Sequence, residues 1–200
     1  ATEIVCELGR RDWLVGRSHE CDWPGEVLAL PRLTEAKFKV EGASADIDAR
    51  VQQIVREGLS VYRVDGEALH ALSPDVIVTQ DHCDVCAVSL ADVEAATCTW
   101  TGRPVHIVSL KPDSLADVYA DIRRVASALR VPESGETLVH SMQRRFAAVS
   151  ERMRGGERPG VAFVEWVEPL MAGGNWMPEL VETAGGRNLF GKAGVRSDWM

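Results

Sequence analysis

The chain has 200 residues, of which 46% are hydrophobic, and a formal net charge of −8. This is enough apolar material for one sizeable core, so a globular protein is expected. The acidic balance argues against a nucleic-acid or anionic-membrane surface, because those partners favour clustered Lys and Arg. No apolar run reaches the roughly 18 residues of a membrane span, so none is predicted.

Helical and strand patterns alternate through the first 130 residues. A helix is predicted over 2–8 and a short strand over 13–16, and the helical opening implies that a strand precedes it. After a Pro- and Gly-rich connection over 24–44, the predicted elements are a helix at 47–55, a strand at 60–64, a helix at 69–72, a strand at 76–79, a helix at 88–96, a strand at 104–110 and a helix at 115–129. Such alternation is typical of βαβ units.

The longest predicted helix covers 134–154, with apolar residues along one face. A strand over 161–167 and a helix over 178–184 then begin a second α/β lobe. The predicted fold class is α/β: two α/β lobes with mainly parallel sheets, joined by a long connecting helix, with the second lobe incomplete in this chain. The expected domains are residues 1–132 for the first lobe, 133–156 for the connecting helix and 157–200 for the start of the second lobe.

Aromatic and polar side chains gather in three segments at the ends of predicted strands. In an open α/β sheet, ligands bind outside the carboxyl ends of the strands. These segments therefore predict a ligand-binding cleft. Its candidate residues are Asp22, Trp23, Asp81, His82, Glu165, Trp166, Asn175 and Trp176.

Four short motifs occur in an order and spacing that is more specific than any one of them. The opening Ala-Thr-Glu-Ile is followed by Val-Gly at 15–16 with Asp-Trp-Pro at 22–24, by Leu-Ser-Pro-Asp-Val-Ile-Val at 72–78 and by Gly-Gly-Arg-Asn-Leu-Phe at 185–190. Together they resemble the class III periplasmic-type binding proteins of ABC transporters, and most closely the cobalamin-binding branch. Trp23 replaces a Tyr of that pattern, and the His- and Cys-rich loop 82–86 departs from it.

The resemblance implies a protein that binds cobalamin or a similar metal chelate, requires no cofactor and delivers its ligand to the permease of an ABC importer. An extracytoplasmic site is implied, while free cysteines leave a cytoplasmic one open. A corrin is a large disc with an amide rim, so Trp23, Trp166 and Trp176 suit its apolar edges. Neither a nucleophile elbow nor a phosphate loop is found, which favours binding over catalysis.

The cysteines support a second interpretation. Five cysteines are an odd number, which does not fit a fully paired disulfide framework. A zinc or iron site, or a redox pair, is therefore the alternative function on the same fold. Its candidate residues are His19, Cys21, His82, Cys83 and Cys86. An enzyme acting on a bound chelate is a third class, which no motif supports directly.

Overall fold

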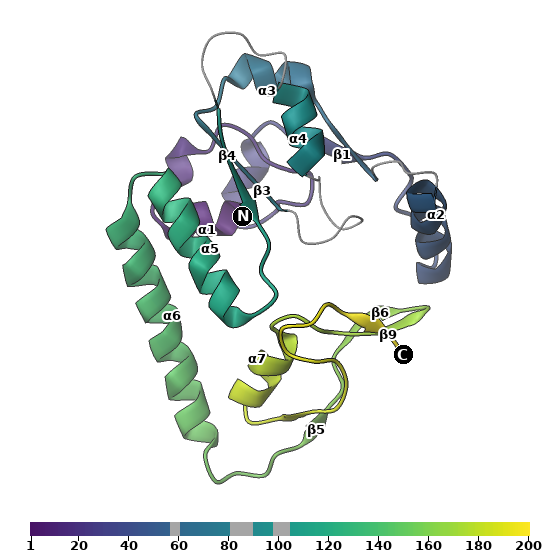
Figure 1. Ribbon diagram of the computed structural model, residues 1–200, viewed down its shortest axis with the longest axis vertical. Coiled ribbons are helices and arrows are strands. Elements are labelled where there is room, and N and C mark those ends of the chain that lie inside the picture. The colour runs from purple at the N-terminus through teal and green to yellow at the C-terminus, as the bar shows by residue number, and fades with distance from the viewer. Residues whose placement is uncertain (57–60, 81–89, 98–104) are drawn as a thin grey trace.

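The computed structural model describes residues 1–56, 61–80, 90–97 and 105–200 (Figure 1). We call the chain up to the end of α5 (Leu115–Ala128) the first lobe and the chain after α6 (Pro132–Met153) the second lobe. The first lobe contains α1 (Thr2–Glu7), η1 (Arg11–Trp13), η2 (Gly25–Ala29), β1 (Thr34–Ala36), α2 (Ser44–Arg56), β2 (Tyr62–Val64), α3 (Gly66–Leu72), β3 (Val76–Gln80), α4 (Leu90–Thr97), β4 (His106–Leu110) and α5 (Leu115–Ala128). Then follow α6 (Pro132–Met153), β5 (Gly160–Val161), β6 (Val164–Val167), β7 (Leu170–Ala172), α7 (Met177–Thr183), β8 (Arg187–Asn188) and β9 (Asp198–Trp199).

The centre of the first lobe is the parallel pair β3 and β4, in which Val76 lies opposite His106 and Gln80 opposite Leu110. The helices α1 and α5 pack together beside this pair. Buried Val5 of α1, Val108 of β4 and Val125 of α5 belong to one apolar cluster. β-Branched residues pack well on the pleated surface of a strand, and apolar residues recur at helical spacing on α5. The sequence pattern therefore accounts for this core.

The two longest helices, α5 and α6, lie side by side (Figure 1). Gly135 permits this close approach, since a Cβ there would lie 2.6 Å from the Cβ of Ala126. Val139 of α6 is completely buried at the contact. Arg123 of α5 and Glu136 of α6 add a bidentate ion pair at 2.7 and 3.0 Å. The long helix is thus packed against the first lobe along its first turns.

The second lobe combines the parallel pair β5 and β8 with the antiparallel sheet β6-β7-β9. Its helix α7 packs on α6. Gly185, at φ +84°, follows α7 and lies against the side chain of Met153 near the end of α6. The long helix therefore contacts both lobes, as Figure 1 shows. In the described part of the chain, no helix has the length and apolarity needed to cross a membrane.

The α/β class and the long helix between two lobes are confirmed by the structure. The predicted strand at 13–16 is wrong: η1 occupies Arg11–Trp13, and only an isolated bridge joins Arg17 to Arg32. The predicted strand at 161–167 divides into β5 and β6, which belong to different sheets because β5 pairs with β8 and β6 with β7. Strand β1, inside the predicted connection 24–44, pairs antiparallel with β2.

The first turn of α5 is closed by a reciprocal capping box. The Ser114 hydroxyl accepts the Asp117 N–H, and the Asp117 carboxylate accepts the Ser114 N–H at 2.9 Å. Both bonds satisfy donors that a helix leaves without an internal partner. The lobe's largest helix thus has a defined start.

Ser114→Ala should lower the free energy of unfolding by about 1 kcal/mol, because it removes the cap of α5. Ser127→Ala is the matched control, since Ser127 is exposed on the last turn of the same helix and Ala is the better helix former. Urea denaturation followed by circular dichroism measures both. A loss of equal size in the two variants would contradict the capping account.

Hydrogen bonds from the Ser114 hydroxyl and from the N–H groups of Asp113 and Ser114 lower the pKa of Asp117. A lowered folded-state pKa stabilises the protein above the unfolded pKa, and this stabilisation is lost as the pH falls through the folded value. The stability difference between the wild type and Asp117→Asn should therefore be constant near neutral pH and should shrink below about pH 4. Urea midpoints over a pH series test this, and a difference that grows on acidification would contradict it.

Candidate functional site

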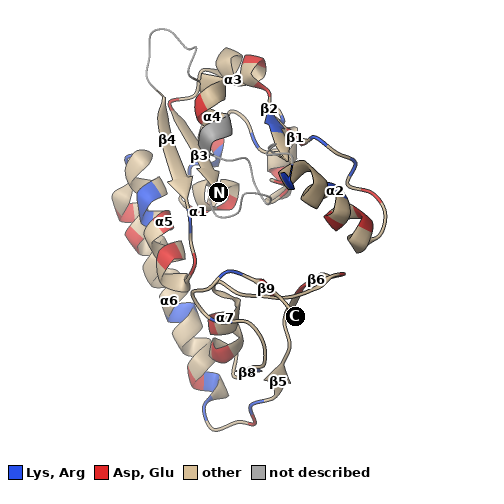
Figure 2. Ribbon diagram, turned by 45° about the vertical axis from the view of Figure 1, so that its right-hand side comes forward, with Lys and Arg blue, Asp and Glu red and all other residues tan. Residues whose placement is uncertain are grey.

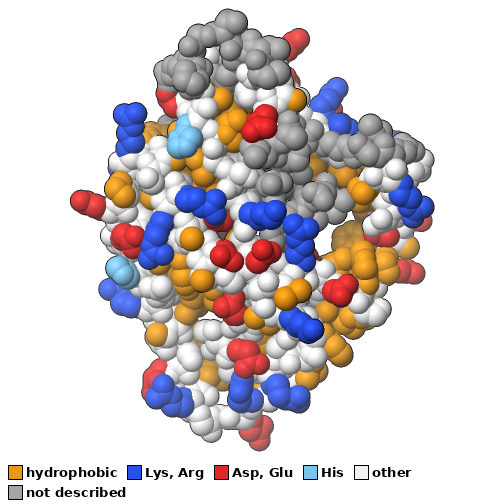
Figure 3. All heavy atoms as spheres, in the orientation of Figure 1, with side chains coloured by type: hydrophobic (Ala, Val, Ile, Leu, Met, Phe, Trp, Pro, Cys, Tyr) orange, Lys and Arg blue, Asp and Glu red, His pale blue; other side chains and the backbone are white. Residues whose placement is uncertain are grey.

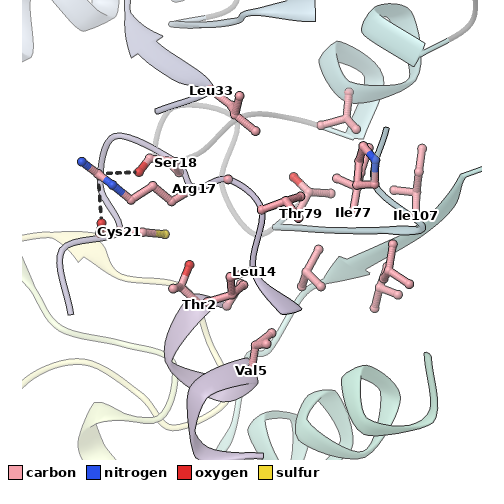
Figure 4. A pocket seen from close by; sticks show the side chains of 18 of the residues that line it. Thr2, Val5, Leu14, Arg17, Ser18, Cys21, Leu33, Ile77, Thr79 and Ile107 are labelled. Atoms are coloured by element: carbon pink, nitrogen blue, oxygen red, sulfur yellow. Dashed lines mark hydrogen bonds between the residues drawn. The ribbon is translucent and has the colours of Figure 1, made fainter. Parts of the chain in front are cut away.

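The loop 18–24 follows the bridge at Arg17 and carries the first two candidates, Asp22 and Trp23. The Arg17 guanidinium shapes this loop by donating to the carbonyls of Ser18 at 3.1 Å and Cys21 at 3.0 Å (Figure 4). Trp23 is 66% exposed, although a large aromatic side chain is usually packed. An exposed Trp on a held loop is typical of a binding surface.

His19 is held beside the β1–β2 hairpin rather than in solvent. Its backbone N–H donates to the Thr34 hydroxyl at 2.9 Å, its ring Nδ1 lies 2.7 Å from the same oxygen, and the ring packs tilted on Tyr62. Nε2 lies 3.1 Å from a Glu20 carboxylate oxygen, but without the direction of a hydrogen bond. Burial raises the pKa of Tyr62, and the charge of Glu20 adds to this rise. The described contacts of His19 thus attach the loop to the hairpin.

The turn 173–176 carries the second-lobe candidates Asn175 and Trp176, which immediately precede α7. Gly174 is required there, because a Cβ would overlap the backbone of 195–197. The Asn175 N–H donates to the Val195 carbonyl at 2.6 Å, and the Gly174 N–H donates to the Ser197 hydroxyl at 3.0 Å. The turn is therefore fixed to the segment that leads into β9.

The other two second-lobe candidates lie on β6. The Ser197 hydroxyl donates to the Glu165 carboxylate, and the Trp166 indole N–H donates to the Glu168 carbonyl at 2.9 Å. Ser197 thus contacts both β6 and the turn 173–176, which brings Glu165 and Asn175 onto one region of the second lobe. Several apolar side chains on or next to the sheet β6-β7-β9 are exposed: Val164, Val167, Leu170, Trp199 and Met200. Figure 3 shows hydrophobic side chains gathered at the right-hand side of the molecule.

One set of described candidates thus lies on the first lobe and the other on the second. In Figure 1, the chain leaves the carboxyl end of β4 toward the second lobe, where β6, β9 and the start of α7 lie nearest. Four predicted site residues, Asp81, His82, Cys83 and Cys86, lie outside the described residues. The described structure therefore gives positions for Asp22 and Trp23 on one lobe and for Glu165, Trp166, Asn175 and Trp176 on the other.

The buried Asp121 of α5 anchors the carboxyl end of β4, a contact that sequence reasoning missed. The Arg124 side chain forms an ion pair with Asp121 and donates to the Ser109 carbonyl at 2.9 Å. Burial raises the pKa of Asp121, while Arg124 opposes that shift. In the sequence, the i, i+3 spacing of Asp121 and Arg124 indicates an ion pair on one helix face. It does not indicate that Arg124 also binds a carbonyl of β4.

A cavity of about 1550 Å³ lies inside the first lobe, beside β3 (Figure 4). Residues from both faces of β3 line it, Val78 on one and Ile77 on the other, so the cavity wraps the edge of β3 opposite β4. The segment 14–18 forms the opposite wall. None of the motifs in the sequence indicated this cavity.

Among the described sequence candidates, His19 and Cys21 line this cavity. The described residues of the predicted ligand site lie outside it, and its walls are mainly apolar. Within the described ranges, no group of three or more His, Cys, Asp or Glu side chains is arranged to hold a metal ion. The described part of the proposed zinc or iron site therefore consists of two residues, with Cys21 half-buried and free of a disulfide.

The chain belongs to the periplasmic binding protein family, whose model matches residues 1–199. The haem-binding protein RhuT of Roseiflexus sp. RS-1 is similar in structure, with a TM-score of 0.66 and 21% identity over 100% of this chain and 66% of that one. The vitamin B12-binding protein BtuF of Vibrio cholerae has a TM-score of 0.62 and 19% identity, with coverages of 100% and 66%. A periplasmic haem-binding protein of Pseudomonas aeruginosa has a TM-score of 0.64 and 19% identity, over 97% of this chain and 61% of that one.

No curated protein matches the chain. The solved structures, at 19 to 21% identity, establish the fold, which is that of the class III binding proteins. The chain spans about two thirds or less of the length of these three relatives, at 66%, 66% and 61%. Proteins of this family bind solutes for transport, and no observation indicates catalysis.

Two substitutions of Asn175 test whether its left-handed backbone conformation contributes to stability. Asn175 has φ +52°, and its side-chain oxygen is buried without a hydrogen bond. Asn175→Gly should leave the thermal midpoint nearly unchanged, while Asn175→Ala should cost about 1 to 2 kcal/mol, because only Gly adopts this conformation without strain. Scanning calorimetry of both variants measures the difference. Equal stability of the Gly and Ala variants would contradict the assigned role of the backbone.

Proposed function

We propose that this chain is the solute-binding component of an ABC importer and that it binds a corrinoid, cobalamin in the first instance, between its two lobes. The proposal rests on two segments: the loop with exposed Trp23 on the first lobe, and, on the second, the turn 173–176 with the exposed apolar side chains of β6, β7 and β9. A flat, partly apolar chelate needs aromatic contact on its edges and a few polar groups at its rim.

The polar groups are suitably distributed for a rim of amides. Asp22 lies beside Trp23, and Glu165 and Asn175 lie in the region that Ser197 joins. Asp81 and His82 belong to the same proposal through the sequence alone.

The comparisons support the ligand class. One similar protein is named for vitamin B12 and two are named for haem, and each of these ligands is a tetrapyrrole chelate. We infer an extracytoplasmic location and a permease partner from the family. The proposed domains are 1–132, 133–156 and 157–200, and the proposed role is binding without catalysis. The net charge of −8 makes nucleic acid an unsuitable partner.

Trp23→Ala and Trp176→Ala should each weaken cyanocobalamin binding by about 1 to 3 kcal/mol, roughly 5- to 150-fold in Kd, because each removes an aromatic face from the ligand. Trp13→Ala is the matched control: Trp13 is 55% exposed and packs under Arg10 at 4.8 Å, outside the three candidate segments. Isothermal titration calorimetry measures all three.

Haemin is titrated in parallel, because it tests the other tetrapyrrole. If haemin binds and cyanocobalamin does not, the proposed ligand changes to haem and the proposed site is unchanged. An absence of heat with both, or an equal loss in the Trp13 control, would overturn the proposal. Stoichiometric zinc or iron in the purified protein, lost in a Cys83→Ser, Cys86→Ser double variant, would instead favour the metal alternative.

A further inference from the structure

A carboxylate of the second lobe accepts a hydrogen bond from the first lobe, independently of the long helix. The Leu115 N–H, at the start of α5, donates to the Oε2 atom of Glu179 at 2.9 Å. The donor belongs to the first lobe and the acceptor to α7 of the second, 64 residues later in the chain. Figures 1 and 2 both show the start of α5 directed toward α7.

This bond has a strong electrostatic basis. The first N–H groups of a helix have no partner within the helix and form its positive end. Ser114 and Asp117 satisfy two neighbouring donors through the capping box, and Glu179 satisfies the donor of Leu115. Hydrogen bonds to a carboxylate are stronger than those between neutral groups. Burial raises the pKa of Tyr119, one turn further along α5, and the negative charge of Glu179 adds to that rise.

The bond between Leu115 and Glu179 is a second link between the lobes, in addition to helix α6. The long helix contacts α5 at one end and α7 at the other, so it sets the separation of the lobes. A helix that acts as the only connector still permits the second lobe to rotate about it. A second attachment, on α7 and away from the α6 axis, removes that rotation. Glu179 supplies such an attachment, and α7 leads directly from Trp176, its N-cap residue.

We propose that Glu179 is a positioning residue that fixes the angle between the lobes, and through α7 the place of the turn 173–176 relative to the first lobe. The helix has seven residues, and the Thr183 hydroxyl donates to the Glu179 carbonyl within it at 2.7 Å. A restraint at Glu179 is therefore transmitted over one turn of helix to Trp176. The effect on a ligand rests on the proposed function, whereas the effect on lobe orientation does not.

The test compares Glu179→Ala with Glu179→Gln, which keeps an acceptor oxygen, and with Glu182→Ala. Glu182 lies on the same helix and accepts from Arg158 and from the Asn188 N–H, both within the second lobe. Residual dipolar couplings of backbone amides report the orientation of each lobe in the ligand-free protein. Hydrogen exchange of the Leu115 amide reports the bond itself. Calorimetry with cyanocobalamin and haemin reports the consequence for binding.

In the wild type and Glu179→Gln, one alignment tensor should fit both lobes. In Glu179→Ala, the lobes should need separate tensors, and the Leu115 amide should exchange roughly tenfold faster or more. Glu182→Ala should retain one tensor even if the second lobe loses stability. One shared tensor in Glu179→Ala, or separate tensors in the Glu182→Ala control, would overturn the proposal.

The ligand titrations separate this inference from the function on which its consequence depends. If cyanocobalamin or haemin binds, Glu179→Ala should weaken it several-fold and Glu179→Gln much less. An unchanged Kd in Glu179→Ala would overturn the link to the ligand. If neither ligand binds the wild type, the proposed function fails, and the couplings alone decide whether Glu179 orients the lobes.

Discussion

The close contact between α5 and α6 is the constraint on which the rest of the architecture depends. It is possible because position 135 is a glycine that lies against Ala126 of α5, and Ala126 and Val139 are both completely buried. Interiors of this density tolerate almost no change in volume, so the two helices behave as one rigid unit. Since α7 packs on α6, the separation of the second lobe from the first depends on this contact. A ligand site shared by both lobes would depend on it in the same way.

The cavity of the first lobe and the proposed ligand site are different places. The cavity lies beside β3 and is lined by side chains from both faces of that strand, which is the environment of a sheet interior. The candidate segments of the two lobes instead combine the exposed Trp23 with the polar side chains of Asp22, Glu165 and Asn175. We therefore base the proposed site on the distribution of side-chain chemistry rather than on volume.

The sequence predicts those elements whose signals are local. The apolar spacing of α5 and the continuous apolar run of β3 each lie within one segment, and the structure has both elements. The segment 13–16 resembles a strand by composition, but a strand exists only where a partner supplies hydrogen bonds, and the described residues provide one bridge at Arg17. The connection 24–44 hides β1 for the complementary reason, because its partner β2 lies about 30 residues away.

The candidate site shows the same division. The Gly-Gly-Asn-Trp turn was recognisable because glycine and asparagine favour turns, and the structure does have Asn175 in the left-handed region. Its attachment to 194–197 could not be predicted, since Ser197 and Val195 carry no pattern that names a partner. Glu179 illustrates the limit most clearly. An acidic residue in the first turn of a helix is common, and only the tertiary structure shows that this one serves the first turn of another helix.

The central claim is that the ligand contacts both lobes at once, and one measurement tests it directly. Cyanocobalamin is titrated into isotope-labelled protein, and changes in the amide and indole N–H signals are mapped onto the structure. The account predicts simultaneous changes at Trp23 on the first lobe and at Asn175 and Trp176 on the second, with the walls of the cavity unaffected. Changes confined to cavity residues such as Leu14, Ile77 and Ile107 would contradict it.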